Sequence, residues 1–376
     1  MAPPEPPPAR VRLTRIGLSN FRNYTEARLT TSRDHVVLAG PNGSGKTNVL
    51  EAISLLSPGR GLRRATYAEM VRQGAPFETG WAVSARVDKG GEESAIGTGL
   101  QGEGSRLVRI DGADARPDDL TRVARILWLT PAMDGLFSGG TSDRRRFLDR
   151  LALALFPYHG RRANAYERAM RQRNKMFEDG VSDPSWYEAV EREMAEHGAA
   201  MAAARVELIV KLNAAQAVRA AAGGDFPQAV LALNGDEGDA DGAAFARRLR
   251  DGRTRDRAAG RTLSGPHRVD MSVTHVEKDM PAALASTGEQ KALLIGIVLG
   301  HAALVTRVTG ETPILLLDEV AAHLDPGRRA ALYDTLDGLG AQTFMTGTDD
   351  SLFTALGDRA DRFRVEAGTI TPQNDA

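Results

Sequence analysis

Apolar residues recur along the chain at two different spacings, which divide it into sheet-forming and helix-forming regions. Alternating apolar positions within residues 11–30 predict two strands joined by a turn around residues 23–24. Residues 79–112 carry short apolar runs separated by glycine and charge, a pattern typical of an antiparallel meander. The apolar run 36–39 predicts a buried strand, and residues 48–56 place apolar side chains on one helical face.

The middle of the chain has a different character. Between residues 141 and 222 the strand signals nearly vanish, and alanine, arginine, glutamate and methionine, which favour helices, predominate. Residues 186–222 carry apolar side chains at a spacing of three to four and predict one helix, roughly 55 Å long at about 1.5 Å per residue. A helix of that length does not fit inside a compact sheet domain. We therefore predict that residues 141–260 form an inserted helical arm.

Strand signals return after residue 265. Residues 271–276 predict a strand, residues 289–305 a strongly apolar helix, and residues 314–317 and 344–346 buried strands. The chain is therefore expected to return to the α/β domain that it left. The predicted segments are a disordered leader at residues 1–10, the first part of a head domain at 11–140, the helical arm at 141–260 and the second part of the head at 261–370.

Composition narrows the class of protein. The 376 residues include no cysteine, which excludes disulfides, thiolate zinc sites and cysteine nucleophiles. No apolar run reaches the length of a membrane span, and the proline-rich N-terminus lacks the apolar segment of a secretory signal, so we expect a cytoplasmic protein without membrane contact. The formal net charge of −1 means that any nucleic-acid binding must come from a local patch. The acidic loop 234–242 misses the spacing of a calcium site and predicts a solvated turn.

The residues that follow the strand at 36–39 have the spacing of a phosphate-binding loop, Gly-Pro-Asn-Gly-Ser-Gly-Lys-Thr. Glycines let the backbone N–H groups turn towards phosphates, and the next helix points its N-terminus at them. We expect Lys46 to reach the β- and γ-phosphates and Thr47 to bind a bridging Mg²⁺ ion. The alternative is a glycine-rich turn that matches by accident. The predicted nucleotide-binding residues are Gly40, Pro41, Asn42, Gly43, Ser44, Gly45, Lys46 and Thr47.

Two carboxylates follow the apolar run 314–317. Asp318 and Glu319 are expected at the carboxyl end of a central parallel strand, which is where ligands bind in open α/β sheets. Asp318 would hold the magnesium ion, and Glu319 would orient or polarise the attacking water. Lys46, Asp318 and Glu319 are therefore the predicted catalytic residues. The alternative is a strand that ends in an ordinary acidic turn.

A third motif lies at residues 285–291, where a turn of small residues opens the apolar helix. Ser286 and Gly288 could offer a hydroxyl group, backbone N–H groups and a helix N-terminus to an anion. The alternative is an ordinary helix cap, with Ser286 or Thr287 capping and Glu289 in the first turn. The motif precedes Asp318 by 32 residues.

Taken together, these motifs resemble the ATP-binding-cassette (ABC) ATPases, in which a Ser-Gly-Gly-Gln-like signature of one subunit closes over the nucleotide of the other. Residues 321–325 resemble the D-loop of that superfamily. Residues 18–24 and 40–53, with the late Asp318-Glu319 pair, resemble the group of DNA-associated ATPases that contains SMC and Rad50. The resemblance narrows to the bacterial RecF family, over about residues 11–365, on four further segments: 144–149, 265–270, 286–291 and 346–349.

The resemblance implies a fold and a function. The fold would be an ABC-type, SMC/Rad50-like P-loop ATPase head with an inserted α-helical arm. ATP and Mg²⁺ would join two copies head to tail, with Ser286 and Gly288 acting in trans, and the closed homodimer would clamp double-stranded or single-stranded DNA or their junctions. Hydrolysis would release the DNA. The family's role implies recombinase loading at gaps, replication restart and SOS induction, with RecR as a partner.

Two features refine this expectation. An SMC or Rad50 arm needs hundreds of residues of heptad repeat, whereas this insertion has about 120 residues. A Rad50-type zinc hook needs cysteines, and this chain has none. Thr348 stands where many relatives carry a histidine after the strand that follows Asp318-Glu319, and no glutamine of the Q-loop kind lies near residues 129–134. We therefore expect weak ATP hydrolysis. Arg60 and Arg63 are candidates for contact with the adenine.

Basic residues concentrate in two places. Residues 140–180 contain ten Arg or Lys against five acids, and residues 247–268 contain eight arginines against two aspartates. Such charge can neutralise DNA phosphates without reading sequence. Arg144, Arg145 and Arg146 are the predicted DNA contacts. The alternative is that these arginines form solvated helix faces and intramolecular pairs.

Two other classes of function stay open at this point. One is the ATPase subunit of an ABC transporter, for which so long an arm would be unusual. The other is an interaction protein that dimerises on ATP without hydrolysing it.

Overall fold

A computed structural model describes residues 7–102, 104–235 and 240–373. Within it the chain forms two compact units. The head unit comprises the residues up to Asp134, residues 222–226 and the residues from Leu294 onward, and the arm unit comprises Gly135–Ala221 and Pro227–Leu293. The sequence led us to expect an arm at residues 141–260. The arm extends further because a strand at residues 229–234 pairs with residues 270–275, which in turn pair with residues 280–281, and together they form a small sheet.

The N-terminal boundary also differs from the expected one. We predicted a disordered leader up to residue 10, but the Ala9 N–H donates to the Gly310 carbonyl at 2.8 Å, and the Thr312 N–H donates to the Ala9 carbonyl at 3.0 Å. The folded head unit therefore includes Ala9. The remainder of that prediction, at residues 1–6, and the centre of the predicted acidic turn, at residues 236–239, lie outside the described residues.

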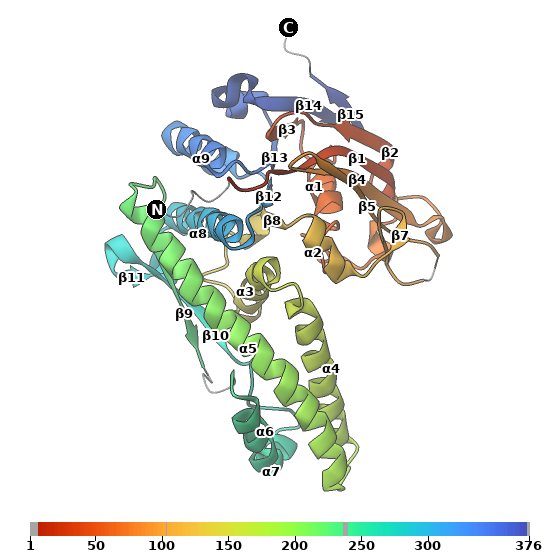
Figure 1. The fold of residues 1–376 in the computed structure, drawn as a ribbon, viewed down its shortest axis with the longest axis vertical. Helices are drawn as coiled ribbons and strands as arrows, with labels where there is room; N and C mark the ends of the chain where they lie inside the picture. The colour runs from red at the N-terminus through yellow and green to blue at the C-terminus, as the bar shows by residue number, and fades with distance from the viewer. Residues whose placement is uncertain (1–6, 103, 236–239, 374–376) are drawn as a thin grey trace. The chain divides into compact units, whose positions relative to one another are not determined.

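The head unit contains a six-stranded sheet, here called the head sheet, with strand order β15-β14-β3-β13-β12-β8 (Figure 1). Its parallel core explains why β12 reads as a continuous apolar run and why every residue of β13 is buried. Only β15 runs antiparallel, against β14. The strands are β3 (His35–Ala39), β8 (Ile126–Leu129), β12 (Ile314–Leu317), β13 (Thr343–Gly347), β14 (Ala360–Glu366) and β15 (Thr369–Pro372).

A second six-stranded sheet of the head unit has the order β2-β1-β4-β5-β6-β7 and is antiparallel, which confirms the predicted meander. The alternation is clearest in β4, where Trp81, Val83, Ala85 and Val87 are buried. β5 was not predicted as a separate strand because glycines replace apolar residues on one of its faces. The strands are β1 (Val11–Phe21), β2 (Tyr24–Thr30), β4 (Trp81–Lys89), β5 (Glu92–Leu100), β6 (Leu107–Ile110) and β7 (Ala113–Asp114).

Helix α1 (Lys46–Ser54) contacts β1 of the meander and β8 and β13 of the head sheet, so it lies between the two sheets. The other helices of the head unit are α2 (Leu120–Val123), α9 (Pro326–Leu339) and the greater part of α8 (Thr287–Thr309). Among the described residues, α8 is long and apolar enough to cross a membrane by length and composition. Its most apolar window is 72% buried inside the protein, as in the core helix of a globular fold.

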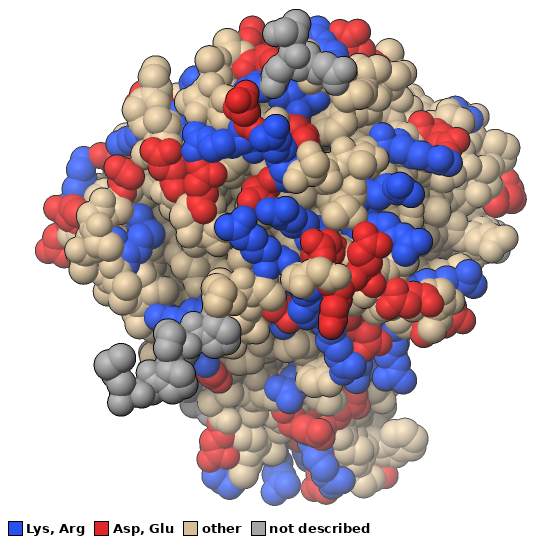
Figure 2. Space-filling view, turned by 45° about the horizontal axis from the view of Figure 1, so that its top comes forward, with Lys and Arg blue, Asp and Glu red and all other residues tan. Residues whose placement is uncertain are grey.

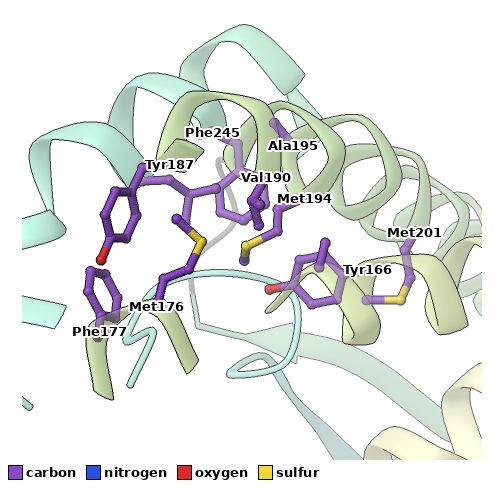
Figure 3. Packing of buried hydrophobic residues seen from close by; sticks show 11 residues of the cluster. Tyr166, Met176, Phe177, Tyr187, Val190, Met194, Ala195, Met201 and Phe245 are labelled. Atoms are coloured by element: carbon purple, nitrogen blue, oxygen red, sulfur yellow. The ribbon is translucent and has the colours of Figure 1, made fainter. Parts of the chain in front are cut away.

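The arm unit is mainly helical. The helix predicted at residues 186–222 is confirmed as α5 (Pro184–Ala221), which packs along α4 (Figure 1). Tyr166 of α4, Met194 of α5 and Phe245 of α6 meet in a buried cluster (Figure 3). Strand β9, which the sequence did not reveal, joins β10 and β11 in a three-stranded sheet against α3 and α5. The remaining elements are α3 (Thr141–Leu155), α4 (His159–Glu178), α6 (Gly242–Asp251), α7 (Arg253–Ala258), β9 (Ala229–Asn234), β10 (Asp270–His275) and β11 (Met280–Pro281).

A buried ionic cluster ties the arm helices together. Arg173 of α4 is fully buried, and its guanidinium donates to Glu191 of α5 at 3.0 Å and to Asp256 of α7 at 2.7 Å. It also donates to the Leu249 carbonyl of α6 at 2.8 Å. Arg253 also pairs with Glu191, at 2.6 Å. Two arginines and two carboxylates thus compensate one another, which is the condition under which buried charge is tolerated.

Candidate functional site

The loop at residues 40–47 joins the end of β3 to the start of α1, as the sequence predicted. Gly45 has φ 116°, and a Cβ atom there would lie 2.7 Å from the Tyr24 hydroxyl oxygen, so this position requires glycine. The Tyr24 hydroxyl donates to the Gly45 carbonyl at 3.0 Å, and the Asn23 amide donates to the Ser44 carbonyl at 3.0 Å. Asn48 of α1 in turn donates to the Asn23 side chain at 2.7 Å. The turn between β1 and β2 therefore holds the loop from outside.

Two polar side chains of the loop, those of Ser44 and Lys46, are buried. The Lys46 amine is nearly buried and donates to the carbonyls of Gly40 at 2.7 Å and Pro41 at 2.9 Å. Burial lowers the pKa of Lys46, and the carboxylates of Glu319 and Asp318 oppose that effect. The buried Ser44 hydroxyl has no hydrogen-bond partner among the described residues. A buried ammonium group and an unpartnered hydroxyl in a glycine-rich loop at the start of a helix fit a phosphate chain.

The acidic pair meets this loop at the carboxyl edge of the head sheet. Asp318 Oδ1 accepts hydrogen bonds from Thr47 Oγ1 at 3.0 Å and from Thr346 Oγ1 at 2.8 Å. Burial raises the pKa of Asp318, as does the neighbouring Glu319 charge, whereas the two threonine bonds lower it. Thr47 and Asp318 are thus adjacent oxygen donors of the kind that Mg²⁺ accepts. Mg²⁺ usually keeps several water ligands and needs only one or two protein groups besides phosphate oxygens, so Thr47 and Asp318 suffice as its protein ligands.

Glu319 directly follows Asp318 and has an unusual backbone. Its φ of 53° lies in the left-handed region, which is uncommon for a residue other than glycine. The Glu319 N–H donates to Thr346 Oγ1 at 2.9 Å. Thr346 therefore contacts both acidic residues; it lies in the segment 346–349 that carries the family resemblance, but no role was predicted for it. Thr348, the position at which the family resemblance led us to expect a histidine, is exposed just after β13.

In this structure residues 285–291 form a helix cap, as one of the two interpretations predicts. The Ser286 hydroxyl donates to a Glu289 carboxylate oxygen at 2.9 Å, and the same oxygen accepts the Ser286 N–H at 3.0 Å. Lys278 binds Glu289 as well, and these bonds, led by that from Lys278, lower the pKa of Glu289 to about 2. Ser286, Thr287 and Gly288 are nevertheless exposed. Ser286 and Gly288 lie in the arm unit, whereas the sequence led us to place them in the head.

The candidate adenine contacts differ in their surroundings. Arg63 donates to Asn48 at 2.5 Å and to Glu51 at 3.0 Å. Glu51 is fully buried and also binds Arg22 through both of its carboxylate oxygens, at 2.7 and 2.8 Å. Arg63 is therefore held against α1, whereas Arg60 is exposed in the turn after it.

The predicted DNA contacts are largely engaged within the arm unit. Arg144 binds both carboxylate oxygens of Asp270, at 2.9 and 2.8 Å, and donates to two backbone carbonyls. Arg145 donates to the Val269 carbonyl at 3.4 Å, and burial lowers its pKa. Arg146 pairs with Asp143. Counting arginines therefore overstated the available positive charge, and basic and acidic side chains are interspersed on the face drawn in Figure 2.

The contacts of Asn23 lead to a prediction. Replacing Asn23 with alanine removes two hydrogen bonds that hold the phosphate-binding loop, each of which contributes about 0.5–1.5 kcal/mol. We expect the affinity for a nucleoside triphosphate to fall about tenfold. Calorimetric titration measures this change, with Thr25→Ala on the exposed face of β2 as the control. An unchanged affinity in Asn23→Ala would show that the loop keeps its conformation without the turn.

Comparison with known proteins gives a consistent result. The family model described as "RecF/RecN/SMC N terminal domain" matches residues 12–371. A protein of Brucella suis biovar 1 (strain 1330) named "DNA replication and repair protein RecF" is 55% identical over 375 residues, 97% of each chain. One of the same name from Mesorhizobium japonicum is 54% identical over 381 residues, covering 98% of this chain and all of the relative.

Solved structures agree on the fold. One is described as "Structure of the recombination mediator protein RecF-ATP in RecFOR pathway". It matches with a TM-score of 0.84 at 22% sequence identity, and the match covers 99% of this chain and 100% of that chain. A Smc head domain with an extended coiled coil from Pyrococcus furiosus has a TM-score of 0.55 at 15% identity, with 96% of each chain covered. These likenesses confirm the predicted α/β fold of an ABC-type ATPase head.

Proposed function

This chain belongs to the RecF family, and from that premise we propose that it is an ATP-binding protein of DNA replication and repair that joins two copies of itself on ATP and holds DNA. The observation that carries the proposal is the convergence of Lys46, Thr47, Asp318 and Glu319 at one edge of the head sheet. Residues 40–47 would surround the triphosphate with backbone N–H groups, and Lys46 would leave the carbonyls of Gly40 and Pro41 for the β- and γ-phosphate oxygens. The unpartnered Ser44 hydroxyl supports this assignment.

Hydrolysis would use the two carboxylates in different roles. Mg²⁺, held by Thr47 and Asp318 with phosphate oxygens, would neutralise charge that develops on the γ-phosphate. Glu319 would accept a proton from the attacking water, which then bonds to the γ-phosphorus as the bond to ADP breaks. Lys46 would stabilise the negative charge on the phosphate oxygens. Thr348 supplies no imidazole to this site, and we therefore propose that turnover is weak.

We assign Ser286 and Gly288 to the triphosphate of a second copy, as in the ABC ATPases that the signature resembles. Both residues are exposed at the N-terminus of α8, a helix of 23 residues, and Leu284 beside them is 72% exposed. An exposed apolar side chain next to exposed hydrogen-bond donors suits a protein–protein contact. Contact with a γ-phosphate would require the Ser286 hydroxyl to exchange its bond to Glu289 for one to the phosphate.

For DNA we propose a different surface from the one expected from the sequence. Helix α4 exposes Arg161, Arg168 and Lys175 at intervals of seven residues, with Arg162 and Arg171 also exposed. Among the described residues, Arg162 and Arg168 have no ion-pair partner. This basic face of α4 offers charge for the phosphate backbone, and the exposed ring beside it, that of Tyr158, lies under the Arg161 guanidinium at 5.4 Å. We therefore propose binding to double-stranded and single-stranded DNA with little sequence preference.

The family's role suggests the setting in which such a protein acts. We propose that it works in the cytoplasm and supports recombinase loading at gaps, replication restart and SOS induction. RecR is the partner protein that this role suggests.

Sedimentation velocity tests the proposal. We expect a monomer without nucleotide, a dimer with ATP and Mg²⁺, and a faster species that carries fluorescent duplex DNA when both are present. Lys46→Ala should stay monomeric, because it lacks the ammonium group that binds the triphosphate. A wild-type protein that remains monomeric in saturating ATP would rule out ATP-dependent dimerisation. DNA binding that is unaffected in an Arg162→Glu/Arg168→Glu variant would remove the basic face of α4 from the proposal.

A further inference from the structure

The order of strands in the head sheet puts β13 between the two halves of the proposed site. β3, which leads into the phosphate-binding loop, pairs with one edge of β13, and β12, which leads into Asp318, pairs with the other. Leu317 lies opposite Met345, so Thr346 is the β13 residue at the level of Asp318. Gly347, the next residue, accepts the Gly40 N–H at 3.2 Å. The end of β13 therefore touches both the phosphate-binding loop and the acidic pair.

The hydrogen bonds of the Thr346 hydroxyl in this arrangement fix which group donates and which accepts. A hydroxyl group has one proton to donate and lone pairs to accept with. Thr346 Oγ1 gives its proton to Asp318 Oδ1 at 2.8 Å and accepts the Glu319 N–H at 2.9 Å. The residue is only 1% exposed, so water cannot replace either bond readily. One buried hydroxyl thus links the carboxylate of one acidic residue to the backbone of the other.

The second bond acts on a strained residue. Glu319 has φ 53°, a conformation that a side chain with a Cβ atom adopts only when its surroundings enforce it. The direction of the Glu319 side chain depends on that backbone conformation. The Thr346 bond to the Glu319 N–H favours it, and without the bond the Glu319 peptide could relax towards ordinary dihedral angles and carry the carboxylate away from its present direction.

We propose that Thr346 is a positioning residue for hydrolysis, which keeps the Glu319 carboxylate directed at the attacking water while Asp318 stays in place for the metal. The proposal rests on the function proposed above. Thr346 need not touch ATP or water, because it acts through the Glu319 backbone. Its effect therefore falls on the chemical step, whereas the affinity for ATP depends on the loop at residues 40–47.

Steady-state kinetics of Thr346→Val, Thr346→Ser and wild-type protein test this inference. Valine keeps the shape of the side chain and removes the hydroxyl, so we expect kcat for ATP to fall at least tenfold. KM and the equilibrium affinity for a non-hydrolysable ATP analogue should change less than about threefold. Serine restores the hydroxyl and should recover most of kcat. Thr369→Val, at an exposed position of β15, is the matched control and should behave as wild type.

Each other outcome contradicts a specific claim. If Thr346→Val keeps the wild-type kcat, or if Thr346→Ser is as slow as Thr346→Val, Thr346 does not position Glu319. Equal losses in kcat and in analogue affinity, with a lowered melting temperature, would assign it a structural role only. If the Glu319→Gln variant hydrolyses ATP at the wild-type rate, the proposed function itself is wrong, and this inference is wrong with it.

Discussion

Replacing Glu319 with glutamine is expected to lower steady-state ATP turnover at least about 100-fold, since general-base catalysis typically contributes a factor of about 10² to 10⁴. Glutamine has nearly the same shape as glutamate but cannot accept a proton from the attacking water. The Glu319 N–H, which binds Thr346, is unchanged by the substitution. We therefore expect ATP binding to persist and the ATP-bound dimer to accumulate. Phosphate release measures the turnover, and sedimentation in ATP measures the dimer.

Glu366→Gln is a suitable control for this experiment. Glu366 ends β14, is exposed, and pairs with Arg364 at 2.7 Å, so its neutralisation should leave turnover unchanged. If Glu319→Gln retains turnover and does not accumulate as a dimer, Glu319 is not the base. Loss of ATP binding in the same variant would instead assign Glu319 to the binding of nucleotide or metal.

Replacing Arg173 with methionine is expected to destabilise the arm unit by about 3–5 kcal/mol, the usual effect of removing one partner from a buried ionic cluster. Methionine fills much of the volume of the arginine stem, so the loss reflects charge more than packing. Arg253 would still neutralise Glu191, but Asp256, which is 1% exposed, would lose its buried cation. The contact of the guanidinium with the Phe177 ring, at 4.7 Å, would also be lost. Urea unfolding followed by circular dichroism of the helices measures the change.

Arg171→Met provides the comparison. Arg171 lies on the same helix, and its side chain is 66% exposed beside Glu167 at 3.8 Å. Exposed pairs of this kind contribute between 0 and about 1 kcal/mol. Equal unfolding midpoints for the two variants would show that the buried cluster contributes no more than a surface pair.

The candidate site residues that lie where the sequence placed them share a property: they form motifs that are local in sequence. The phosphate-binding loop needs only a strand, a loop and a helix in succession, and Asp318-Glu319 needs only the end of an apolar strand. Thr346 could not be selected in this way, because its contacts depend on β13 lying between β3 and β12 in the sheet, although their order in the chain is β3, β12, β13. Asn23 was recognised as part of a turn, but its contact with the loop joins residues that are 21 positions apart.

The arm shows a different limit of inference from sequence. Repeating apolar residues revealed α5, whose burial follows its own periodicity. They did not reveal that residues 270–281 complete the arm, because the pairing of β9 with β10 joins residues 36 (Asn234 and Asp270) to 46 (Ala229 and His275) positions apart. Charge counts failed for a related reason. Arg173, Arg253 and Arg144 are bound to carboxylates from other elements, and a count of basic residues cannot distinguish them from the exposed arginines of α4.

The position of the Arg173 cluster also separates two responses to ionic strength. Dissolved salt screens charges in contact with water within a Debye length of about 10 Å at 0.1 M, but it has little access to an arginine with no exposed surface. Contacts between exposed arginines and DNA phosphates weaken steeply as the salt concentration rises, because the release of counterions from the DNA then gains less entropy. Concentrated salt should therefore strip nucleic acid from the protein during purification while the arm stays folded. The same preparation, once desalted, should bind DNA again without a refolding step.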